Sequence, residues 1–263
     1  MNQLNVNLPE LPYAVSEAMN RLRINIKFCG KNTRKILLTS CQPNEGKSTI
    51  SSYLWKMLAE AGFPTVLVDV DLRKSVMKTR FQMDYDDDTT MGLNHYLSGM
   101  AEYEDVIYST NIPNGYMVPC TQLLENPSAL LEDVRFKELL NTLSENYRFV
   151  IIDSPPLGSV SDGALIASLC DGAVLVVRAG TTPRTLIKQS LYEIQQSGCK
   201  LLGTVLNRAD VKGRAYGKYG YGKYGYGYGY GYGYGYGYGY GYEPKDKKNS
   251  SDSAAADKNS TGK

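Results

Sequence analysis

The chain has 263 residues, which is enough for one sizeable α/β domain or at most two small ones. It contains no run of 18 uninterrupted apolar residues, and its start lacks the basic and apolar regions of a secretory signal, so we expect neither a membrane-spanning helix nor a signal peptide. The five cysteines are scattered and show no C-x-x-C spacing, which fits a reducing cytosol and argues against a disulfide framework or a zinc site.

The net charge of +2 is unevenly distributed. Residues 211–263 carry nine Lys or Arg and four Asp or Glu, a balance of +5, and the other 210 residues carry 20 and 23, a balance of −3. Nucleic-acid-binding domains gather basic residues on a folded face. A basic tail on a slightly acidic body does not have this pattern, so no nucleic-acid partner is expected.

The first predicted element is an amphipathic helix over residues 13–28, with Ser16 as a candidate N-cap. After it, five apolar segments rich in β-branched residues are bounded by turn residues and predict strands buried on both faces. These segments are residues 35–40, 65–70, 148–153, 172–177 and 200–207.

Helix-like segments alternate with these strands, at residues 47–62, 128–146 and 184–198. Their apolar residues recur at spacings of three and four, and Gly62 and Gly198 suit helix C-caps. Alternating strands and helices predict a mostly parallel sheet covered by helices on both faces. We place this α/β domain in residues 1–210.

Residues 211–263 differ from the rest of the chain. Thirteen of the 22 tyrosines lie between Tyr216 and Tyr242, separated mostly by single glycines, and the last 20 residues are polar. Glycine at every second position makes ordering costly in backbone entropy, and no aliphatic side chains offset that cost in the repeat. A disordered C-terminal tail is therefore predicted.

Residues 39–50, TSCQPNEGKSTI, approximate the phosphate-binding pattern G-x-x-x-x-G-K-[ST]. Cys41 stands in place of the first glycine, but Gly46, Lys47 and Ser48 supply close backbone approach, a cation for the β/γ-phosphates and a hydroxyl for Mg²⁺. A predicted strand precedes the loop, and the helix starting at Lys47 would point its free N–H groups at an anion. Taken alone, so short a pattern also fits an ordinary turn at a helix start.

Aspartates follow two other predicted strands. Asp69 and Asp71 are two residues apart and so lie on one side of the chain, and Asp153 ends the strand at 148–153. These residues and the phosphate loop should meet at the carboxyl edge of the sheet, where ligands bind in open α/β folds. Strand-end aspartates can also simply cap helices, but carboxylates and a hydroxyl beside a phosphate loop favour Mg·ATP binding. The predicted fold is thus a P-loop NTPase-like sandwich whose cofactors are ATP and Mg²⁺.

The order of these motifs resembles that of the bacterial tyrosine kinases (BY-kinases), specifically the separate cytoplasmic subunit of Gram-positive capsule and exopolysaccharide systems. The resemblance covers about residues 10–210. It is carried by PNEGKST as Walker A, VDVDLRK as Walker A′, VIIDSPP as Walker B, ENPSALL, and SEAMNRLRINI in the N-terminal helix.

The family implies specific roles for the loop and its neighbours. ATP would be bound by Pro43, Asn44, Glu45, Gly46, Lys47, Ser48 and Thr49, and by Asn207, at a position where related ATPases place an adenine contact. A strand-ending turn asparagine is nearly as plausible a reading of Asn207. The metal would be held by Ser48, Asp71 and Asp153. The catalytic residues would be Lys47, Asp69 and Asp71, with Asp69 favoured as the acceptor of the tyrosine proton.

The resemblance also implies a non-specific protein-tyrosine autokinase that phosphorylates the tail of a neighbouring copy and so regulates capsule or exopolysaccharide synthesis. A Gly-rich tail of 27 residues has an r.m.s. span of about 30 Å, enough to reach an adjacent subunit. The implied acceptors are Tyr216, Tyr219, Tyr221, Tyr224, Tyr226, Tyr228, Tyr230, Tyr232, Tyr234, Tyr236, Tyr238, Tyr240 and Tyr242. A sticky low-complexity segment or a repeat expanded by replication slippage are alternative readings of the tail.

Members of the family assemble into rings through a Glu-x-x-Arg-x-x-Arg pattern in the helix at 13–28. Here Glu17 and Arg23 match, and Asn20 stands in place of the middle arginine. The family further implies a cytoplasmic enzyme recruited to the inner face of the cell membrane by a transmembrane activator or adaptor, and reset by a cognate tyrosine phosphatase.

A rival function is a MinD/ParA-like ATPase switch, which shares the fold and all three motifs. Such switches typically carry a second lysine early in the loop, where this chain has Cys41 and Gln42, and a Tyr-rich tail has no role in them. A dinucleotide-binding enzyme is disfavoured because no G-x-G-x-x-G follows any predicted strand.

Overall fold

The five predicted strands form the centre and one edge of an eight-stranded sheet with the order β1-β4-β5-β3-β6-β2-β7-β8. The computed structural model describes residues 3–86, 89–158 and 162–209. Its strands are β1 (Gln3–Leu4), β2 (Lys35–Ser40), β3 (Thr65–Asp69), β4 (Tyr108–Thr110), β5 (Gly115–Val118), β6 (Phe149–Asp153), β7 (Gly172–Arg178) and β8 (Leu201–Asn207). All neighbouring strands pair in parallel except β4 and β5, so the mostly parallel sheet is confirmed.

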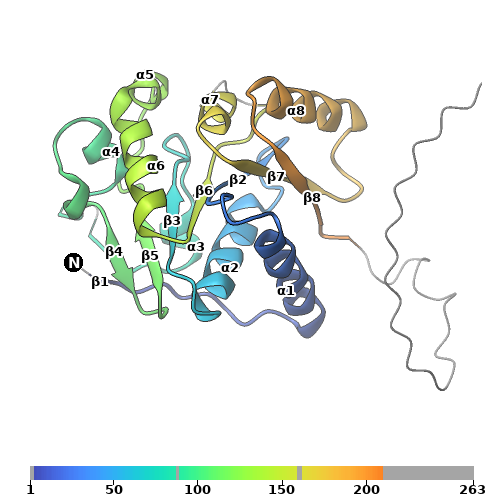
Figure 1. Ribbon diagram of the computed structural model, residues 1–263, viewed down its shortest axis with the longest axis horizontal. Helices are drawn as coiled ribbons and strands as arrows, with labels where there is room; N and C mark the ends of the chain where they lie inside the picture. Colours follow the sequence, from blue (N-terminus) through green and yellow to red (C-terminus); the bar gives the residue numbers. More distant parts are fainter. Residues whose placement is uncertain (1–2, 87–88, 159–161, 210–263) are drawn as a thin grey trace, which may run out of the picture. The chain divides into compact units, whose positions relative to one another are not determined.

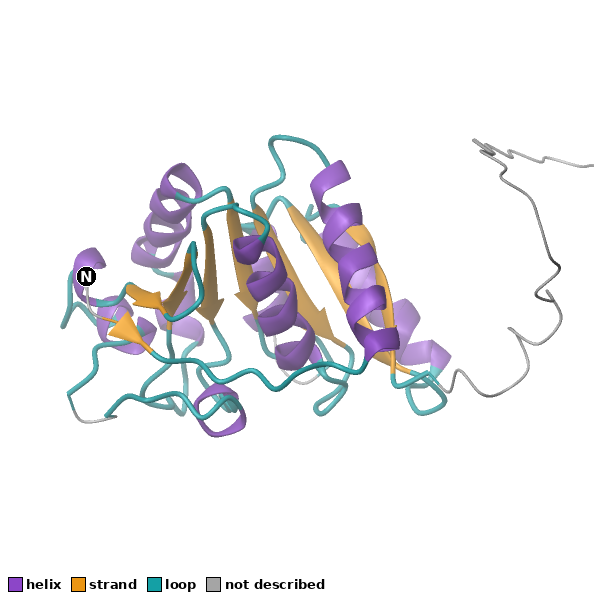
Figure 2. Ribbon diagram, turned by 90° about the horizontal axis from the view of Figure 1, so that it is seen from below, coloured by secondary structure: helices purple, strands orange, loops and turns teal. Residues whose placement is uncertain are grey.

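Helices cover both faces of this sheet, as Figures 1 and 2 show. The helices are α1 (Tyr13–Phe28), α2 (Lys47–Glu60), α3 (Met77–Arg80), α4 (Leu93–Leu97), α5 (Ser128–Glu132), α6 (Val134–Asn146), α7 (Asp162–Ser168) and α8 (Arg184–Gln196), with a 3₁₀ turn at Tyr103–Asp105. Helices α1 and α2 pack against each other on one face, and α6, α7 and α8 lie on the other.

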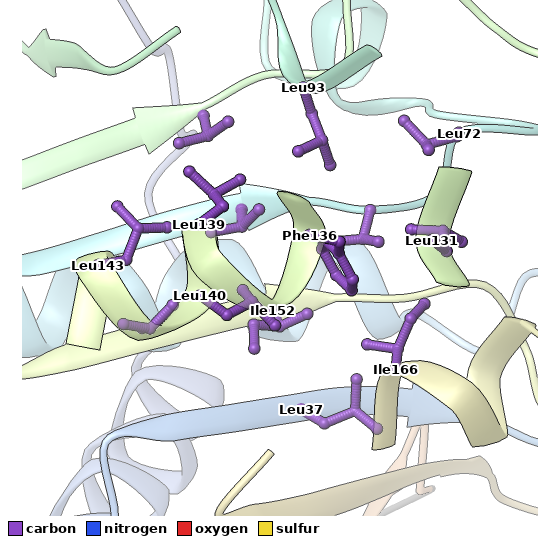
Figure 3. Close-up of a cluster of buried hydrophobic side chains, with 14 of the residues drawn as sticks. Leu37, Leu72, Leu93, Leu131, Phe136, Leu139, Leu140, Leu143, Ile152 and Ile166 are labelled. Carbon is purple, nitrogen blue, oxygen red and sulfur yellow. The ribbon is translucent and has the colours of Figure 1, made fainter. Parts of the chain in front are cut away.

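The central strands supply both hydrophobic cores because successive side chains point to opposite faces. On β2, Leu37 joins the core beneath α4–α8, whereas Ile36 and Leu38 join the core beneath α1 and α2. Figure 3 shows the first core, where Ile152 of β6 lies near Phe136 of α6 and Leu37 of β2 lies near Ile166 of α7. Burial on both faces explains why these strands appear in the sequence as continuous apolar runs.

The strand at 200–207 does not fit this prediction. Among the described strands, β8 pairs only with β7, and its residues are exposed or half-buried, with Leu206 60% exposed. Burial on both faces was therefore wrong here, because at this edge of the sheet the residues that the structure describes cover the two faces of the strand only in part. The apolar run alone does not distinguish an edge strand from a central one.

Two helix predictions also need correction. The segment 128–146 forms two helices, because the backbone at Asp133 is extended and its side chain accepts a hydrogen bond from the Arg135 N–H at 2.9 Å, capping α6. Helix α1 begins at Tyr13 after Pro12, so Ser16 lies inside the helix and is not its N-cap. The C-cap glycines are confirmed, since Gly62 and Gly198 have φ of +86° and +78°.

Three strands were not predicted. Strands β1, β4 and β5 have two, three and four residues, too few to show a hydrophobic period. Within the residues that the structure describes, no helix is both long and apolar enough to cross a bilayer. The tail at 211–263 and its thirteen acceptor candidates lie outside the described residues.

Candidate active site

The phosphate loop lies between the end of β2 and the start of α2 at Lys47. Gly46 has φ +95°, and a Cβ atom on it would lie 2.1 Å from Asn207 Nδ2, so the position requires glycine. Among the described residues, no side chain caps the N-terminus of α2. The amide groups of its first turn are therefore available to an anion, with the positive end of the helix dipole behind them.

The carboxylates converge on this loop as the strand order requires. Asp153 of β6 is paired in register with Leu38 of β2 on one side and with Asp69 of β3 on the other. The Lys47 Nζ atom lies 2.9 Å from Asp153 Oδ2 and 3.6 Å from the Oδ2 atom of Asp71, just beyond β3. A buried lysine thus sits between two carboxylates at the carboxyl edge of the sheet.

This charge cluster sets the protonation of its members. Burial alone would lower the pKa of Lys47, but the charges of Asp153 and Asp71 outweigh burial and raise it, so the ammonium stays charged. Burial and the charge of Asp153 raise the pKa of Asp69 to about 8. Burial also raises the pKa of Asp71, although Lys47 opposes that shift.

A cavity opens beside the loop, bounded by the phosphate loop itself and by residues of the segments 71–80 and 155–156. It lies on the β6 and β3 side of the loop, where Lys47, Ser48 and Asp71 all line it. Asp69 is not among the lining residues, is 1% exposed, and accepts a hydrogen bond from the hydroxyl of Ser75. Asp69 is the last residue of β3 and Asp71 lies two residues beyond it, and Asp71 is thus the one open to a ligand.

Asn207 stands on the opposite side of the loop, at the end of β8. Its Nδ2 group donates a 2.8 Å hydrogen bond to the Glu45 carbonyl oxygen, and its Oδ1 atom accepts one from the Arg208 N–H. On the cavity side, Arg80 donates to the Thr49 hydroxyl at 3.1 Å. The predicted loop residues and Asn207 therefore lie at one site.

Comparisons with known proteins agree with this geometry. The AAA domain family matches residues 33–195. The tyrosine-protein kinase CpsD of Streptococcus agalactiae is 42% identical over 208 residues, which are 79% of this chain and 90% of the relative. The chain belongs to the bacterial tyrosine kinase family. Its enzyme class is accordingly protein-tyrosine kinase.

Solved structures give the same family. The chimerical protein CapA2B2 has a TM-score of 0.70 and 33% identity, covering 78% of this chain and 92% of its own. The kinase domain of the Escherichia coli tyrosine kinase ETK has a TM-score of 0.67 and 28% identity, covering 81% and 80%. The septum site-determining protein MinD of Pyrococcus horikoshii, solved with Mg-ADP, has a TM-score of 0.57 and 26% identity, covering 70% of this chain and 72% of its own. The P-loop NTPase-like fold of this kinase is thus confirmed.

Sequence reasoning missed one buried residue of the kinase site. The Ser51 Oγ atom is fully buried and lies 3.0 Å from Asp153 Oδ1, while Lys47 holds the other carboxylate oxygen. Ser51 thereby fixes the orientation of Asp153. Its spacing of three from Ser48 on α2, which places both on one helix face, is the signal that could have found it.

The groups of this site fit a phosphate-bound Mg²⁺ better than a metal held by protein alone. Within residues 3–86, 89–158 and 162–209, no group of three or more His, Cys, Asp or Glu side chains is placed to hold a metal ion. Mg²⁺ usually keeps several waters and takes one or two carboxylates together with substrate phosphates. A serine hydroxyl and two carboxylates beside an uncapped helix N-terminus meet that requirement.

Proposed function

We propose that this kinase transfers the γ-phosphoryl group of Mg·ATP to tyrosines 216–242 in the tail of a neighbouring copy. The supporting observation is the buried Lys47, held between Asp153 and Asp71 at the uncapped start of α2 and beside an open cavity. Phosphoryl transfer needs mainly positioning and charge neutralisation, which these groups can supply. The tail supplies thirteen near-equivalent acceptors.

Each group then has a distinct role. Loop residues 43–49 hold the triphosphate, and Lys47 exchanges its carboxylate partners for phosphate oxygens. Ser48, Asp71 and Asp153 hold Mg²⁺, which when bound neutralises charge on the β- and γ-phosphates. Asn207 is placed by β8 on the far side of the loop, where it can contact the base.

The residue that accepts the tyrosine proton is one of the two aspartates at the end of β3, Asp69 or Asp71. Asp69 is our sequence-based assignment, and its raised pKa of about 8 suits proton exchange near neutral pH. Asp71 lines the cavity and is the more accessible of the two. A tyrosine entering the cavity would meet Asp71 first, so both remain assigned to the catalytic pair.

Assembly and location complete the proposal. Glu17 and Arg23 lie half-buried on α1, where the Nε and Nη2 groups of Arg23 donate to Asn20 Oδ1 at 3.1 and 2.7 Å. We assign this helix to a homo-oligomeric ring that brings each tail to the next site. A transmembrane activator recruits the ring to the inner membrane face, a tyrosine phosphatase resets it, and the cycle regulates capsule or exopolysaccharide synthesis.

The rival prediction from the sequence is an ATPase switch without kinase activity, and the likeness to MinD supports only the fold that both classes share. An anti-phosphotyrosine blot of the purified protein incubated with Mg·ATP separates the two. We expect a strong signal in the wild type and none in Lys47→Met. ATP hydrolysis without any phosphotyrosine would favour the switch.

A further inference from the structure

Glu45 has an unusual position for a carboxylate in a phosphate loop. It is 3% exposed, although it stands in the segment that approaches an anion. Its Oε2 atom accepts hydrogen bonds from the N–H groups of Cys41 and Gln42, at 2.8 and 2.9 Å. The carboxylate therefore points back to the beginning of the loop and away from the first turn of α2.

The other carboxylate oxygen reaches a second element. Oε1 accepts a hydrogen bond from the hydroxyl of Thr182, in the turn between β7 and α8. The backbone carbonyl oxygen of Glu45 accepts a hydrogen bond from the side-chain amide of Asn207. Glu45 thus joins the loop to the ends of β7 and β8, the two strands on the far side of β2 from the cavity.

We propose that Glu45 is a positioning residue whose carboxylate serves as an internal anion that holds the phosphate loop in its binding conformation. The N–H groups of Cys41 and Gln42 both bind Glu45 Oε2, and bonds to a charged acceptor are stronger than neutral ones. This contact lies at the start of the loop, where G-x-x-x-x-G-K-[ST] has its first glycine and this chain has Cys41. The amides at the start of α2 stay free for phosphate, since no described side chain caps them. The loop is thereby ordered before nucleotide arrives.

This role predicts a particular kinetic signature. Without the Glu45 contacts the phosphate loop samples other conformations. The apparent dissociation constant of the nucleotide then rises in inverse proportion to the fraction of molecules whose loop is in the binding conformation. Saturating nucleotide restores that conformation, so KM should rise while kcat changes little. A residue that only stabilised the fold would instead lower the melting temperature and leave affinity unchanged in the folded fraction.

The test compares Glu45→Ala and Glu45→Gln with Glu60→Ala, an exposed control near the end of α2 whose side chain pairs with Lys56. The dissociation constants of Mg·ATP and Mg·ADP are measured by calorimetry on the full chain. We expect Glu45→Ala to bind both about tenfold more weakly, as expected for buried bonds to a charged acceptor. Glu45→Gln, which retains one acceptor oxygen, should stay within about threefold of the wild type. Glu60→Ala should match the wild type.

Amide exchange provides a local readout. In Glu45→Ala the amides of Cys41 and Gln42 should exchange faster, while those of β2 keep their protection. A folded Glu45→Ala protein with wild-type affinity and exchange would overturn the proposal, as would a fall in kcat at unchanged KM. If Glu45→Ala does not fold, Thr182→Val decides: about threefold weaker binding at an unchanged melting temperature supports the role, and unchanged affinity rejects it.

The inference rests on the nucleotide-binding part of the proposed function only. Affinity is measured without phosphoryl transfer, so a chain that binds Mg·ATP but makes no phosphotyrosine would remove the kinase mechanism and leave the role of Glu45 decided. If the wild type binds no nucleotide at all, both the proposed kinase function and the role of Glu45 are rejected.

Discussion

At the scale of single residues, the site is a set of charges held close together by burial. Lys47 is 6% exposed and Asp153 is fully buried, so their attraction is little screened by water. A buried ion pair is costly unless further hydrogen bonds satisfy it, and Ser51 provides one to Asp153.

Asp69 should make the stability of the metal-free and nucleotide-free protein depend on pH. Its carboxyl has an ordinary pKa of 3.8 and a folded-state pKa of about 8, so the folded state binds more protons between these values. Its contribution to the free energy of unfolding is therefore largest below pH 4 and is lost as the pH rises to about 8. Asp69→Asn removes this loss.

Thermal unfolding in chelator from pH 5 to 9 measures this effect. We expect the melting temperature of Asp69→Asn to exceed that of the wild type by a margin that grows up to about pH 8 and is then constant. Asp84→Asn changes an exposed carboxylate and is the control. A margin independent of pH would contradict the raised pKa.

Ser51 and Ser52 form a matched pair for the orientation of Asp153. Both are fully buried with their hydroxyl oxygens within 3.0 Å of the Ser48 carbonyl oxygen, but of the two only Ser51 also lies 3.0 Å from Asp153 Oδ1, which is an alternative acceptor for its one proton. Ser51→Ala should raise the Mg²⁺ concentration for half-maximal autophosphorylation about tenfold, because groups that orient a metal ligand tune its affinity. Ser52→Ala should leave it nearly unchanged. Equal shifts in the two variants would assign the effect to helix packing instead.

At the scale of elements, the loop is held by strand ends that are far apart in the sequence. Gly46 faces Asn207 of β8, 161 residues later, so close that a side chain at position 46 would have to displace the Asn207 amide. Gly62 has a similar left-handed backbone, but a Cβ atom there would meet nothing within 4 Å. The two glycines therefore separate the effect of crowding from that of backbone strain.

Gly46→Ala should weaken Mg·ATP binding at least about tenfold, because the methyl group displaces Asn207 and shifts the loop. Gly62→Ala carries only the backbone cost of about 1 kcal/mol, which should lower the melting temperature by about 3 °C and leave affinity unchanged. Titration of both variants with nucleotide checks this. Wild-type affinity in Gly46→Ala would show that Asn207 is free to move aside.

Much of this arrangement can be predicted from the sequence. The central strands bury both faces and so have continuous apolar runs, and Asp69, Asp71 and Asp153 stand where those strands end. The short strands β1, β4 and β5 carry no such signal. The spacing of Ser51 from Ser48 places both on one helix face, but the contact of Ser51 with Asp153 depends on which buried groups the sheet brings together, and the spacing does not identify that partner. The exposure of β8 likewise depends on its place at the edge of the described sheet, which its own residues do not record.

At the scale of the whole molecule, phosphorylation should change how copies associate. The segment 211–263 has a charge of +5, and each phosphate adds about −1.5 to −2 charges. A few phosphates cancel the positive charge, and more make the tails repel one another. We predict that incubation with Mg·ATP lowers the oligomer mass of the wild type but not of Lys47→Met. Light scattering before and after incubation measures this, and an unchanged wild-type mass would reject it.

The most direct test of the account is transfer between two full-length chains. The donor carries phenylalanine at all thirteen tail tyrosines, and the acceptor carries Lys47→Met with its tail intact. They are mixed with Mg·ATP and membranes that contain the activator, and phosphate is located by mass spectrometry. We expect phosphotyrosine between residues 216 and 242 of the acceptor. An acceptor that stays unmodified, although the donor binds Mg·ATP, would contradict it.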